Sequence, residues 1–478
     1  MAETTETLDS LKSGIASGRL SGCTRLKLAD NLSSFPTEIL ALAASLTFLN
    51  LSNNNLSHLP PEFAQLKQLK IVFFNSNHFE TFPTILAQCP QLSIVSFKNN
   101  QIKSIKPQAL SSSIRWLILT NNQLSSLPTT IGQLPNLQKL MLAGNQLHAL
   151  PSELAYCKNL ELIRISENRI ETLPAWLLSM PRLAWLAYAG NPCHPVHTTL
   201  QNSTQPDQST IQTINSSDLQ QKELIGEGAS GFIHKGIWTP SNPPKENFHL
   251  RTQQPALPSQ TVAIKYFKGN ITSDGSPLDE MNACIAAGEH PNLVTVLGKY
   301  CHENESEKKG LIFSYLSSDY KNLGNPPSLE SCTRDTYDQQ TAFTLTEALR
   351  VAKGIASAAQ HLHSRNIMHG DLYAHNILIN QTGHSILGDF GAASFYDPAT
   401  VGQRLEKIEI RAFGCLLEDL LSHLATSESK EKSNKTFNTC ANSLEALEQL
   451  TKTCLQPAVE KRPLFAEVTH LVDKLFAP

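Results

Sequence analysis

The fold of the first half of the chain is decided by the stretch LQKLMLAGNQL, residues 137–147. Its asparagine belongs to a series that recurs every 22 or 23 residues, namely Asn54, Asn77, Asn100, Asn122, Asn145, Asn168 and Asn191. Apolar residues precede the asparagines at fixed intervals, as Leu137, Leu140 and Leu142 do here. This period predicts stacked coils whose inward side chains fill one continuous core, with the asparagine amide bonded between neighbouring coils.

This frame resembles the leucine-rich repeat, which implies an α/β solenoid. We predict that residues 23–193 form about eight such repeats. Residues 1–22 are predicted to cap the N-terminal end of the solenoid, with a helix over residues 8–20. The repeat stretch contains no catalytic cluster, so its function should lie in binding.

One strand position in each coil is expected to face away from the core, on the concave side of the solenoid. In six of seven successive coils this position is apolar or aromatic, with Lys139 as the exception. Single apolar residues on a surface need no explanation, but a contiguous row predicts a docking face for a protein or peptide. Its expected contact residues are Phe48, Ile71, Trp116, Leu162 and Trp185.

Composition narrows the class of protein. The net charge is −3, which gives no basic footprint for nucleic acid. The ten cysteines are scattered, as suits a reducing compartment better than a disulfide framework. The first ten residues lack the pattern of a signal peptide, and no run approaches 18 apolar residues. We therefore expect a cytoplasmic protein without a membrane span.

Two polar stretches separate or interrupt the domains. Residues 194–219 are rich in Gln, Ser, Thr and Asn, which predicts a flexible linker. Residues 238–260 contain five prolines and predict a long loop between strands. Residues 317–342 form a further insertion that carries no recognisable chemistry.

The second half contains four short motifs in a fixed order. They are GEGASG at residues 226–231, VAIK at 262–265, HGDLYAHN at 369–376 and DFG at 389–391. A glycine-rich loop alone is weak evidence, but four ordered motifs are specific. Residues 220–478 resemble the eukaryotic-type protein kinases. The resemblance implies a multidomain chain in which an α+β bilobal kinase domain, using ATP and Mg²⁺, follows the repeats.

The resemblance also implies the nucleotide-binding residues. The glycine-rich hairpin would close over the phosphates through Gly226, Glu227, Gly228 and Gly231. Lys265, on a strand with Ala263, would hold the α- and β-phosphates and needs a glutamate partner on the next helix. We predict that Glu280 is this partner, with Asp279 and Glu289 as alternatives. The backbone of Ser314 and Leu316 would read the adenine edge.

The catalytic and metal residues follow from the same resemblance. Asp371 matches the catalytic base, which accepts the proton of the substrate hydroxyl. Asn376 and Asp389 match the magnesium ligands, since amide and carboxylate oxygens suit a hard cation. A structural role for this Asp–Asn pair is the alternative.

Several positions depart from the family pattern. Gly370 stands where an arginine normally pairs with an activation-segment phosphate, so we predict activity independent of phosphorylation there. Tyr373 replaces the usual lysine near the γ-phosphate. No Ala-Pro-Glu motif follows Asp389, which implies that the platform for a peptide substrate is reduced. Arg462, which would pair with that glutamate, is expected to find another partner, with Glu406 as the candidate.

Three functions fit these motifs. The first is an active protein kinase, serine/threonine-specific by family base rate, whose repeats recruit the substrate. The second is a small-molecule phosphotransferase, because antibiotic kinases also carry His-Gly-Asp. The third is an inactive kinase-like scaffold, although Lys265, Asp371, Asn376 and Asp389 are all retained. The first is the prediction.

Overall fold

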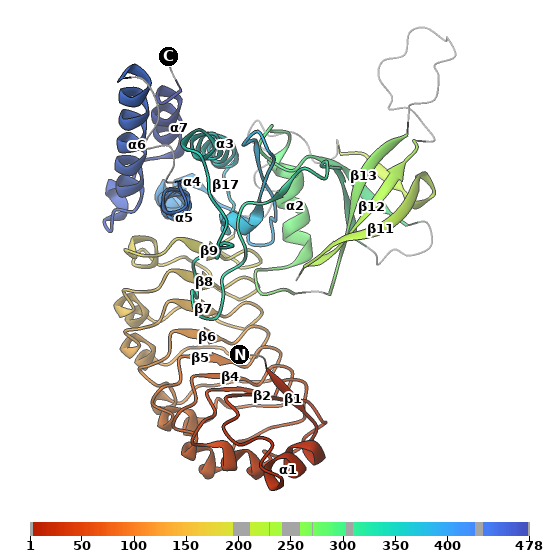
Figure 1. The fold of residues 1–478 in the computed structure, drawn as a ribbon, viewed down its shortest axis with the longest axis vertical. Coiled ribbons are helices and arrows are strands. Elements are labelled where there is room, and N and C mark those ends of the chain that lie inside the picture. Colours follow the sequence, from red (N-terminus) through yellow and green to blue (C-terminus); the bar gives the residue numbers. More distant parts are fainter. Residues whose placement is uncertain are drawn as a thin grey trace.

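The computed structural model describes residues 3–194, 211–228, 230–240, 259–269, 271–302, 309–425 and 434–476. It shows two domains in contact, a curved repeat array (residues 4–194) and a C-terminal domain (residues 211–476), as Figure 1 shows. Most of the expected linker and of the first insertion lies outside the described residues, as does Ala229 of the glycine-rich loop.

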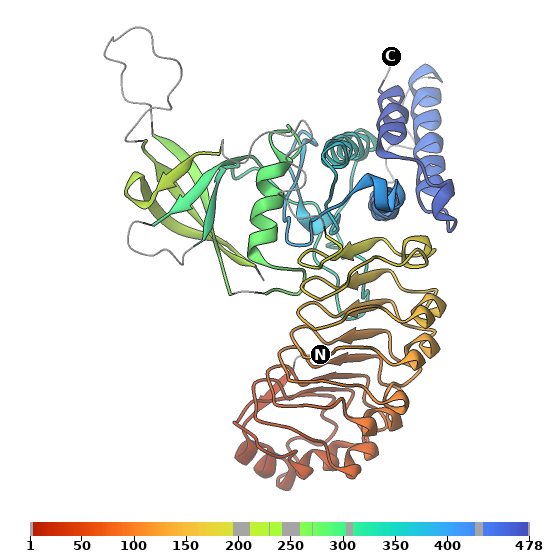
Figure 2. The ribbon, with the colours of Figure 1, turned by 180° about the vertical axis from the view of Figure 1, so that it is seen from behind.

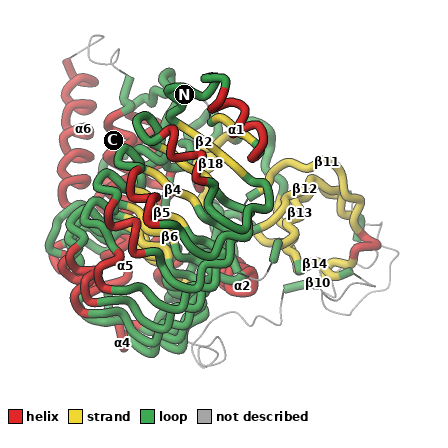
Figure 3. Tube along the Cα trace, turned by 90° about the horizontal axis from the view of Figure 1, so that it is seen from below, coloured by secondary structure: helices red, strands yellow, loops and turns green. Residues whose placement is uncertain are grey.

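Within the described residues the array forms one nine-stranded parallel sheet in sequential order. Eight coils contribute one short strand each: β2 Arg25–Leu28, β3 Phe48–Asn50, β4 Ile71–Phe73, β5 Ile94–Ser96, β6 Trp116–Ile118, β7 Lys139–Met141, β8 Leu162–Arg164 and β9 Trp185–Ala187. Short 3-10 helices form the opposite side (Figure 3). The solenoid prediction is confirmed, because leucines at the fixed intervals fill a single buried core.

The N-terminal cap has a helix and a strand. Helix α1 (Leu8–Ala16) begins at Thr7, whose hydroxyl accepts a hydrogen bond from Ser10 N at 3.2 Å. Strand β1 (Thr4–Glu6) pairs in parallel with β2 and extends the sheet by one strand. The sequence did not predict β1, because residues 4–6 are polar and lack the repeat frame.

The recurrent asparagines link successive coils, as predicted. Asn145 Nδ2 donates to Leu119 O and Leu142 O, each at 2.9 Å, and its Oδ1 accepts from Leu124 N at 3.0 Å. The residue before several of these asparagines has a positive φ, as at Asn121 (55°) and Gly144 (69°). One amide thereby satisfies three buried backbone groups at each bend.

The small lobe of the C-terminal domain is a six-stranded sheet in the order β10-β14-β15-β13-β12-β11. Its strands are β10 Thr213–Asn215, β11 Leu219–Glu227, β12 Gly231–Trp238, β13 Gln260–Phe267, β14 Val296–Cys301 and β15 Gly310–Ser314, with helix α2 Pro277–Ala287 beside them. Strand β10 lies inside the stretch expected to be linker and pairs with β14, so the domain begins before residue 220.

The large lobe is mainly helical and lies over the last coils of the array (Figures 1 and 2). Its helices are α3 Leu345–Ser364, α4 Pro398–Val401, α5 Arg404–Ser422, α6 Asn434–Cys454 and α7 Phe465–Lys474. Short strands β16 Lys321–Asn322, β17 Ile367–Met368, β18 Ile377–Ile379, β19 Ser385–Leu387 and β20 Ser394–Phe395 frame its motifs. Helix α3 starts with a capping box between Thr344 and Glu347.

The array and the large lobe share a hydrophobic core, which corrects the predicted docking face. Leu162 and Trp185 are 3 % and 2 % exposed and belong to the same buried cluster as Leu372. Phe48 is also buried, with the Arg25 guanidinium 3.9 Å from its ring centre. Trp116 and Ile71 are half-buried. The partner of the C-terminal part of this row is therefore the same chain.

Candidate phosphotransfer site

Lys265 and Glu280 form a buried ion pair between strand β13 and helix α2. Ser276 caps the helix, and Glu280 lies four residues later, one turn into it. Asp279 instead accepts a hydrogen bond from the Ser276 hydroxyl at 2.8 Å. Burial acts to lower the pKa of Lys265, but the charges of Glu280 and Asp389 outweigh it and hold that pKa above its ordinary value. Of the three carboxylates considered, Glu280 is the one at the lysine.

The glycine-rich hairpin joins β11 to β12, where a hairpin was predicted. Gly228 N donates to Gly231 O at 3.0 Å and closes the turn. A Cβ on Gly231 would lie 2.2 Å from Tyr266 O, so only glycine fits there. Glu227 pairs with Lys268 at 2.6 Å, while Gly226 lies beside Ile233.

The segment expected to read adenine follows strand β15. Ala263 pairs with Phe313 across β13 and β15, and Ser314 is the last residue of that strand. Ser314 N donates to Thr295 O at 3.0 Å, so this backbone N–H is used inside the protein. Leu316 is half-buried two residues beyond the strand, where the chain passes to the large lobe.

Glu409 of helix α5 anchors the segment that carries Asp371, residues 369–376, which we call the catalytic loop. Its carboxylate accepts from Gly370 N at 2.7 Å, His369 N at 3.2 Å and His363 Nε2 at 2.8 Å. Burial acts to raise the pKa of Glu409, but the hydrogen bond from His363 and the neighbouring histidine charges hold it below its ordinary value. An ionised glutamate thus fixes the backbone that carries Asp371.

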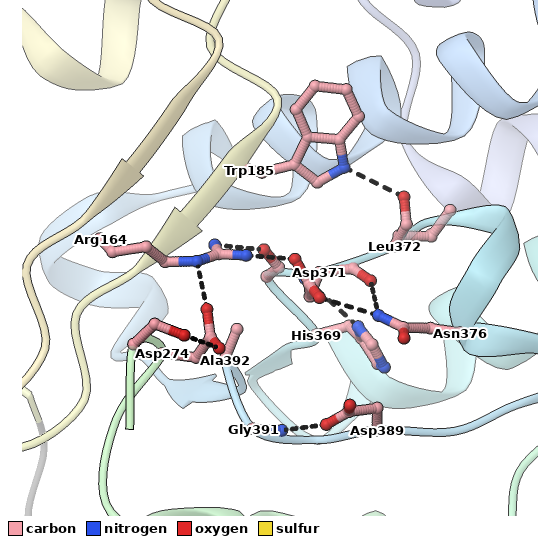
Figure 4. Close-up of polar contacts among 12 residues, drawn as sticks. Arg164, Trp185, Asp274, His369, Asp371, Leu372, Asn376, Asp389, Gly391 and Ala392 are labelled. Atoms are coloured by element: carbon pink, nitrogen blue, oxygen red, sulfur yellow. Dashed lines mark hydrogen bonds and ion pairs between the residues drawn. The ribbon is translucent and has the colours of Figure 1, made fainter. Parts of the chain in front are cut away.

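Asp371, Asn376 and Asp389 lie together at this loop (Figure 4). Asn376 Nδ2 donates to Asp371 O at 2.9 Å and to Asp371 Oδ2 at 2.8 Å, so the amide presents its Oδ1 to a ligand. Asp389 has φ 53°, and its Oδ1 accepts from Gly391 N at 3.1 Å. One amide and one carboxylate oxygen fit Mg²⁺, which keeps water and phosphate in its shell.

Gly370 is required by the contact with the array. Its φ is 73°, and a Cβ there would lie 2.6 Å from both Leu186 O of strand β9 and Ala392 O. Any larger residue would strain the backbone and push the array away. The arginine expected at this position from the family pattern is therefore sterically excluded by the repeats.

Arg164 of strand β8 reaches the catalytic loop from the array. Its Nε donates to Asp274 Oδ1 at 2.7 Å, its Nη1 to Gly370 O at 3.0 Å, and its Nη2 pairs with Asp371 (Figure 4). The side chain is 2 % exposed. Sequence reasoning missed Arg164. The sequence offered only a weak signal, an arginine directly after the apolar residues Ile118 and Met141 in its strand row.

Trp185 covers the other side of the loop. Its indole stacks on Tyr373 with ring centres 4.3 Å apart and planes at 5°, and its Nε1 donates to Leu372 O at 3.1 Å. Tyr373, at the position expected to be lysine, is therefore buried against the array. The repeats therefore cover Leu372 and Tyr373 of this loop.

The insertion at residues 317–342 also contacts the array. The Thr333 hydroxyl donates to Glu161, and Arg115 donates to Leu329 O and Glu330 O at 2.8 Å each. Asp335 from the same insertion accepts from His375 Nδ1 at 2.7 Å. The insertion therefore bridges the catalytic loop and the coils, a role that its sequence did not reveal.

Arg462 does not pair with Glu406, so that prediction is wrong. Its guanidinium donates to three carbonyl oxygens, Gln456 O at 2.8 Å, Lys407 O at 3.1 Å and Pro181 O of the array at 2.7 Å. Glu406 Oε1 instead accepts from Phe465 N at 2.7 Å. Burial lowers the pKa of Arg462 to about 10. The array thus supplies one of the three acceptors of the Arg462 guanidinium.

Comparison with known families agrees with this geometry. The model for protein tyrosine and serine/threonine kinases matches residues 219–429, and leucine-rich-repeat models match residues 45–66, 90–147 and 135–192. The chain contains a protein kinase domain preceded by leucine-rich repeats. No helix in the described ranges is both long and apolar enough to cross a membrane.

The curated relatives are kinases of both specificities. The chain is 29 % identical over 183 residues to L-type lectin-domain containing receptor kinase V.7 of Arabidopsis thaliana, and 25 % identical over 199 residues to receptor tyrosine-protein kinase erbB-4 of Homo sapiens. It is 24 % identical over 321 residues to "Probable serine/threonine-protein kinase kinY" of Dictyostelium discoideum. These alignments cover 37 %, 40 % and 58 % of this chain, and 24 %, 13 % and 52 % of the respective relatives.

Proposed function

We propose that this protein is an ATP-dependent protein kinase, specific for serine or threonine, with Asp371 as its catalytic base. The observation that carries the proposal is the joint presence of the Lys265–Glu280 ion pair and the Asp371–Asn376 hydrogen bonds, with Asp389 close enough to raise the pKa of Lys265. Positioning and charge neutralisation supply most of the catalysis in phosphoryl transfer, and these residues provide both.

Each residue has a defined task in this proposal. Lys265, held by Glu280, would bind phosphate oxygens, and the hairpin around Gly228 would cover them. Asn376 and Asp389 would hold Mg²⁺, which supplies neutralisation of the phosphate charge when bound. Asp371 would accept the proton of the substrate hydroxyl. The nine described cysteines are free, which supports a reducing compartment such as the cytoplasm.

The inactive-scaffold alternative is disfavoured by the assembled ion pair. Burying two charges costs free energy of desolvation, so we expect a chain without phosphotransfer activity to lose the buried Lys265–Glu280 pair. The small-molecule alternative keeps one argument, since Trp185 and Tyr373 close the approach that a peptide would use. The experiment must therefore report the identity of the acceptor.

The test is transfer from labelled ATP with Mg²⁺ by the full chain, followed by phosphoamino-acid analysis. Lys265→Met, Asp371→Asn and Asp389→Asn should each reduce transfer by at least about a hundredfold. Asp473→Asn, an exposed carboxylate paired with Lys353, is the matched control and should leave transfer unchanged. Full transfer by Asp389→Asn would refute the mechanism, and label found on tyrosine would refute the specificity.

A further inference from the structure

Arg164 connects the two lobes of the kinase domain from outside that domain. One arm of its guanidinium binds Asp274, which lies in the small lobe just before helix α2. The other arm binds Gly370 O and Asp371 in the catalytic loop of the large lobe. A planar guanidinium presents its donors in a fixed fork, so it sets the distance between these two segments.

The small-lobe arm leads directly to the Lys265–Glu280 pair. The Ser166 hydroxyl of the same array strand region donates to Asp274 O, which gives the loop a second anchor. Thr272 Oγ1 accepts from Gly275 N at 3.2 Å and closes the turn that ends at Ser276, the cap of α2. Glu280 follows one helical turn later. The position of Asp274 thus sets where α2 begins.

The large-lobe arm depends on the glycine that departs from the family pattern. Gly370 lacks a side chain because Leu186 O of the array approaches it. In the same place Arg164, from the neighbouring array strand, supplies a cation to the catalytic loop. The catalytic loop thus has no arginine of its own at position 370, and Arg164 of the array places a guanidinium against the same loop.

We propose that Arg164 is a positioning residue of the phosphotransfer site, and that the repeat array is a built-in activator of the kinase domain. This inference rests on the proposed kinase activity. With the array docked, Lys265 is paired with Glu280, and Asn376 is bound to Asp371. An array that held the domain inactive would be expected to dock on a disassembled site. If the array instead inhibits the domain, Arg164→Met should raise the activity.

The test uses full-length variants and steady-state transfer from ATP to an added acceptor protein, with a Mg²⁺–ATP analogue for binding. Arg164→Met should lower kcat by about a hundredfold, the size expected when a reacting group is misplaced by about 1 Å, with analogue affinity within about threefold. Arg164→Lys keeps the charge but not the planar fork, so it should recover no more than about tenfold of that loss. As a single substitution Asp274→Asn should also lower kcat. Combined with Arg164→Met, it should cause no further loss of kcat.

The matched control is Arg115→Met, which removes another array arginine, one whose guanidinium donates to Leu329 O and Glu330 O. It should keep kcat within about twofold, which separates positioning from interface stability. Amide exchange over residues 277–287 should rise in Arg164→Met and not in Arg115→Met. Equal effects of the two variants, or a gain of activity in Arg164→Met, would overturn the proposal. If the wild-type chain transfers no phosphate, the kinase proposal fails, while the exchange data still decide whether Arg164 holds α2.

Discussion

Replacing Trp185 by alanine tests whether the array is a structural part of the kinase domain. The indole is 2 % exposed, stacks on Tyr373 and donates to Leu372 O. Truncation of a buried tryptophan costs about 3–5 kcal/mol, the stacked pair contributes about 0.5–1.5 kcal/mol beyond its area, and the orphaned carbonyl costs about 1–3 kcal/mol. These contributions overlap, so we expect a loss of about 5 kcal/mol.

Calorimetric melting of the full chain measures this loss. For a domain of kinase size, 1 kcal/mol shifts Tm by about 2–4 °C, so Trp185→Ala should melt at least about 10 °C below the wild type. Trp185→Phe keeps one stacked ring but loses the hydrogen bond and the second ring of the indole, and its melting temperature should fall by no more than half as much. Because the contact joins two domains, we also expect the single transition to split in Trp185→Ala.

Trp116→Ala is the matched control from the same row of the array. Trp116 is half-buried, with Lys139 Nζ 4.3 Å from its ring centre, a contact worth about 1 kcal/mol. Its melting temperature should fall by no more than about 4 °C. If Trp185→Ala melts like Trp116→Ala, the contacts of Trp185 with the catalytic loop do not hold the domains together.

Three further outcomes are expected. Burial and the neighbouring Asp279 carboxylate raise the pKa of Glu167 to about 7, so the folded state binds more protons than the unfolded state between about pH 4.5 and 7, and stability falls as pH rises through that range. Glu167→Gln should therefore melt higher than the wild type at pH 8 and equally at pH 5, and a parallel pair of pH curves would contradict this. Glu409→Gln, which removes the charge that holds His369 N and Gly370 N, should cost about 3 kcal/mol in urea unfolding, and a loss below about 1 kcal/mol would argue against the anchor. Thr400→Ala and phosphatase treatment should each leave kcat within about twofold. Mass spectrometry should find no phosphate on Ser394 or Tyr396, because Ser394 is fully buried and Tyr396 nearly so.

The repeat fold was predictable because its information is local. A period of 22 or 23 residues fixes both the core leucines and the asparagine amides, so one coil defines the next. Strands β1 and β10 were not predictable, since Thr4–Glu6 is polar and Thr213–Asn215 has a single apolar residue, Ile214. Both are three-residue segments that become strands through pairing with β2 and β14. Tertiary context decides such segments.

The residues of the candidate site also fall into a predictable and an unpredictable group. Lys265, Asp371, Asn376 and Asp389 stand in short motifs whose spacing the chemistry requires, so the sequence reveals them. Arg164 stands more than 200 residues from Asp371 in the chain, and its partners become visible only when the coils dock. The docking prediction failed at Leu162 and Trp185 for the same reason. An outward-facing apolar position does not say whether its partner is another protein or a later part of the same chain.

The bond between Arg462 and Pro181 O has a consequence for biogenesis. The two residues are 281 positions apart. At a synthesis rate of roughly 5–20 residues per second, the last coil leaves the ribosome about 15–55 s before Arg462 does. Coils that contact only their neighbours fold quickly, so the finished solenoid edge is waiting when the large lobe emerges. The repeats would then act as an intramolecular template, and deletions in the final coil should show up first as aggregation of nascent chains.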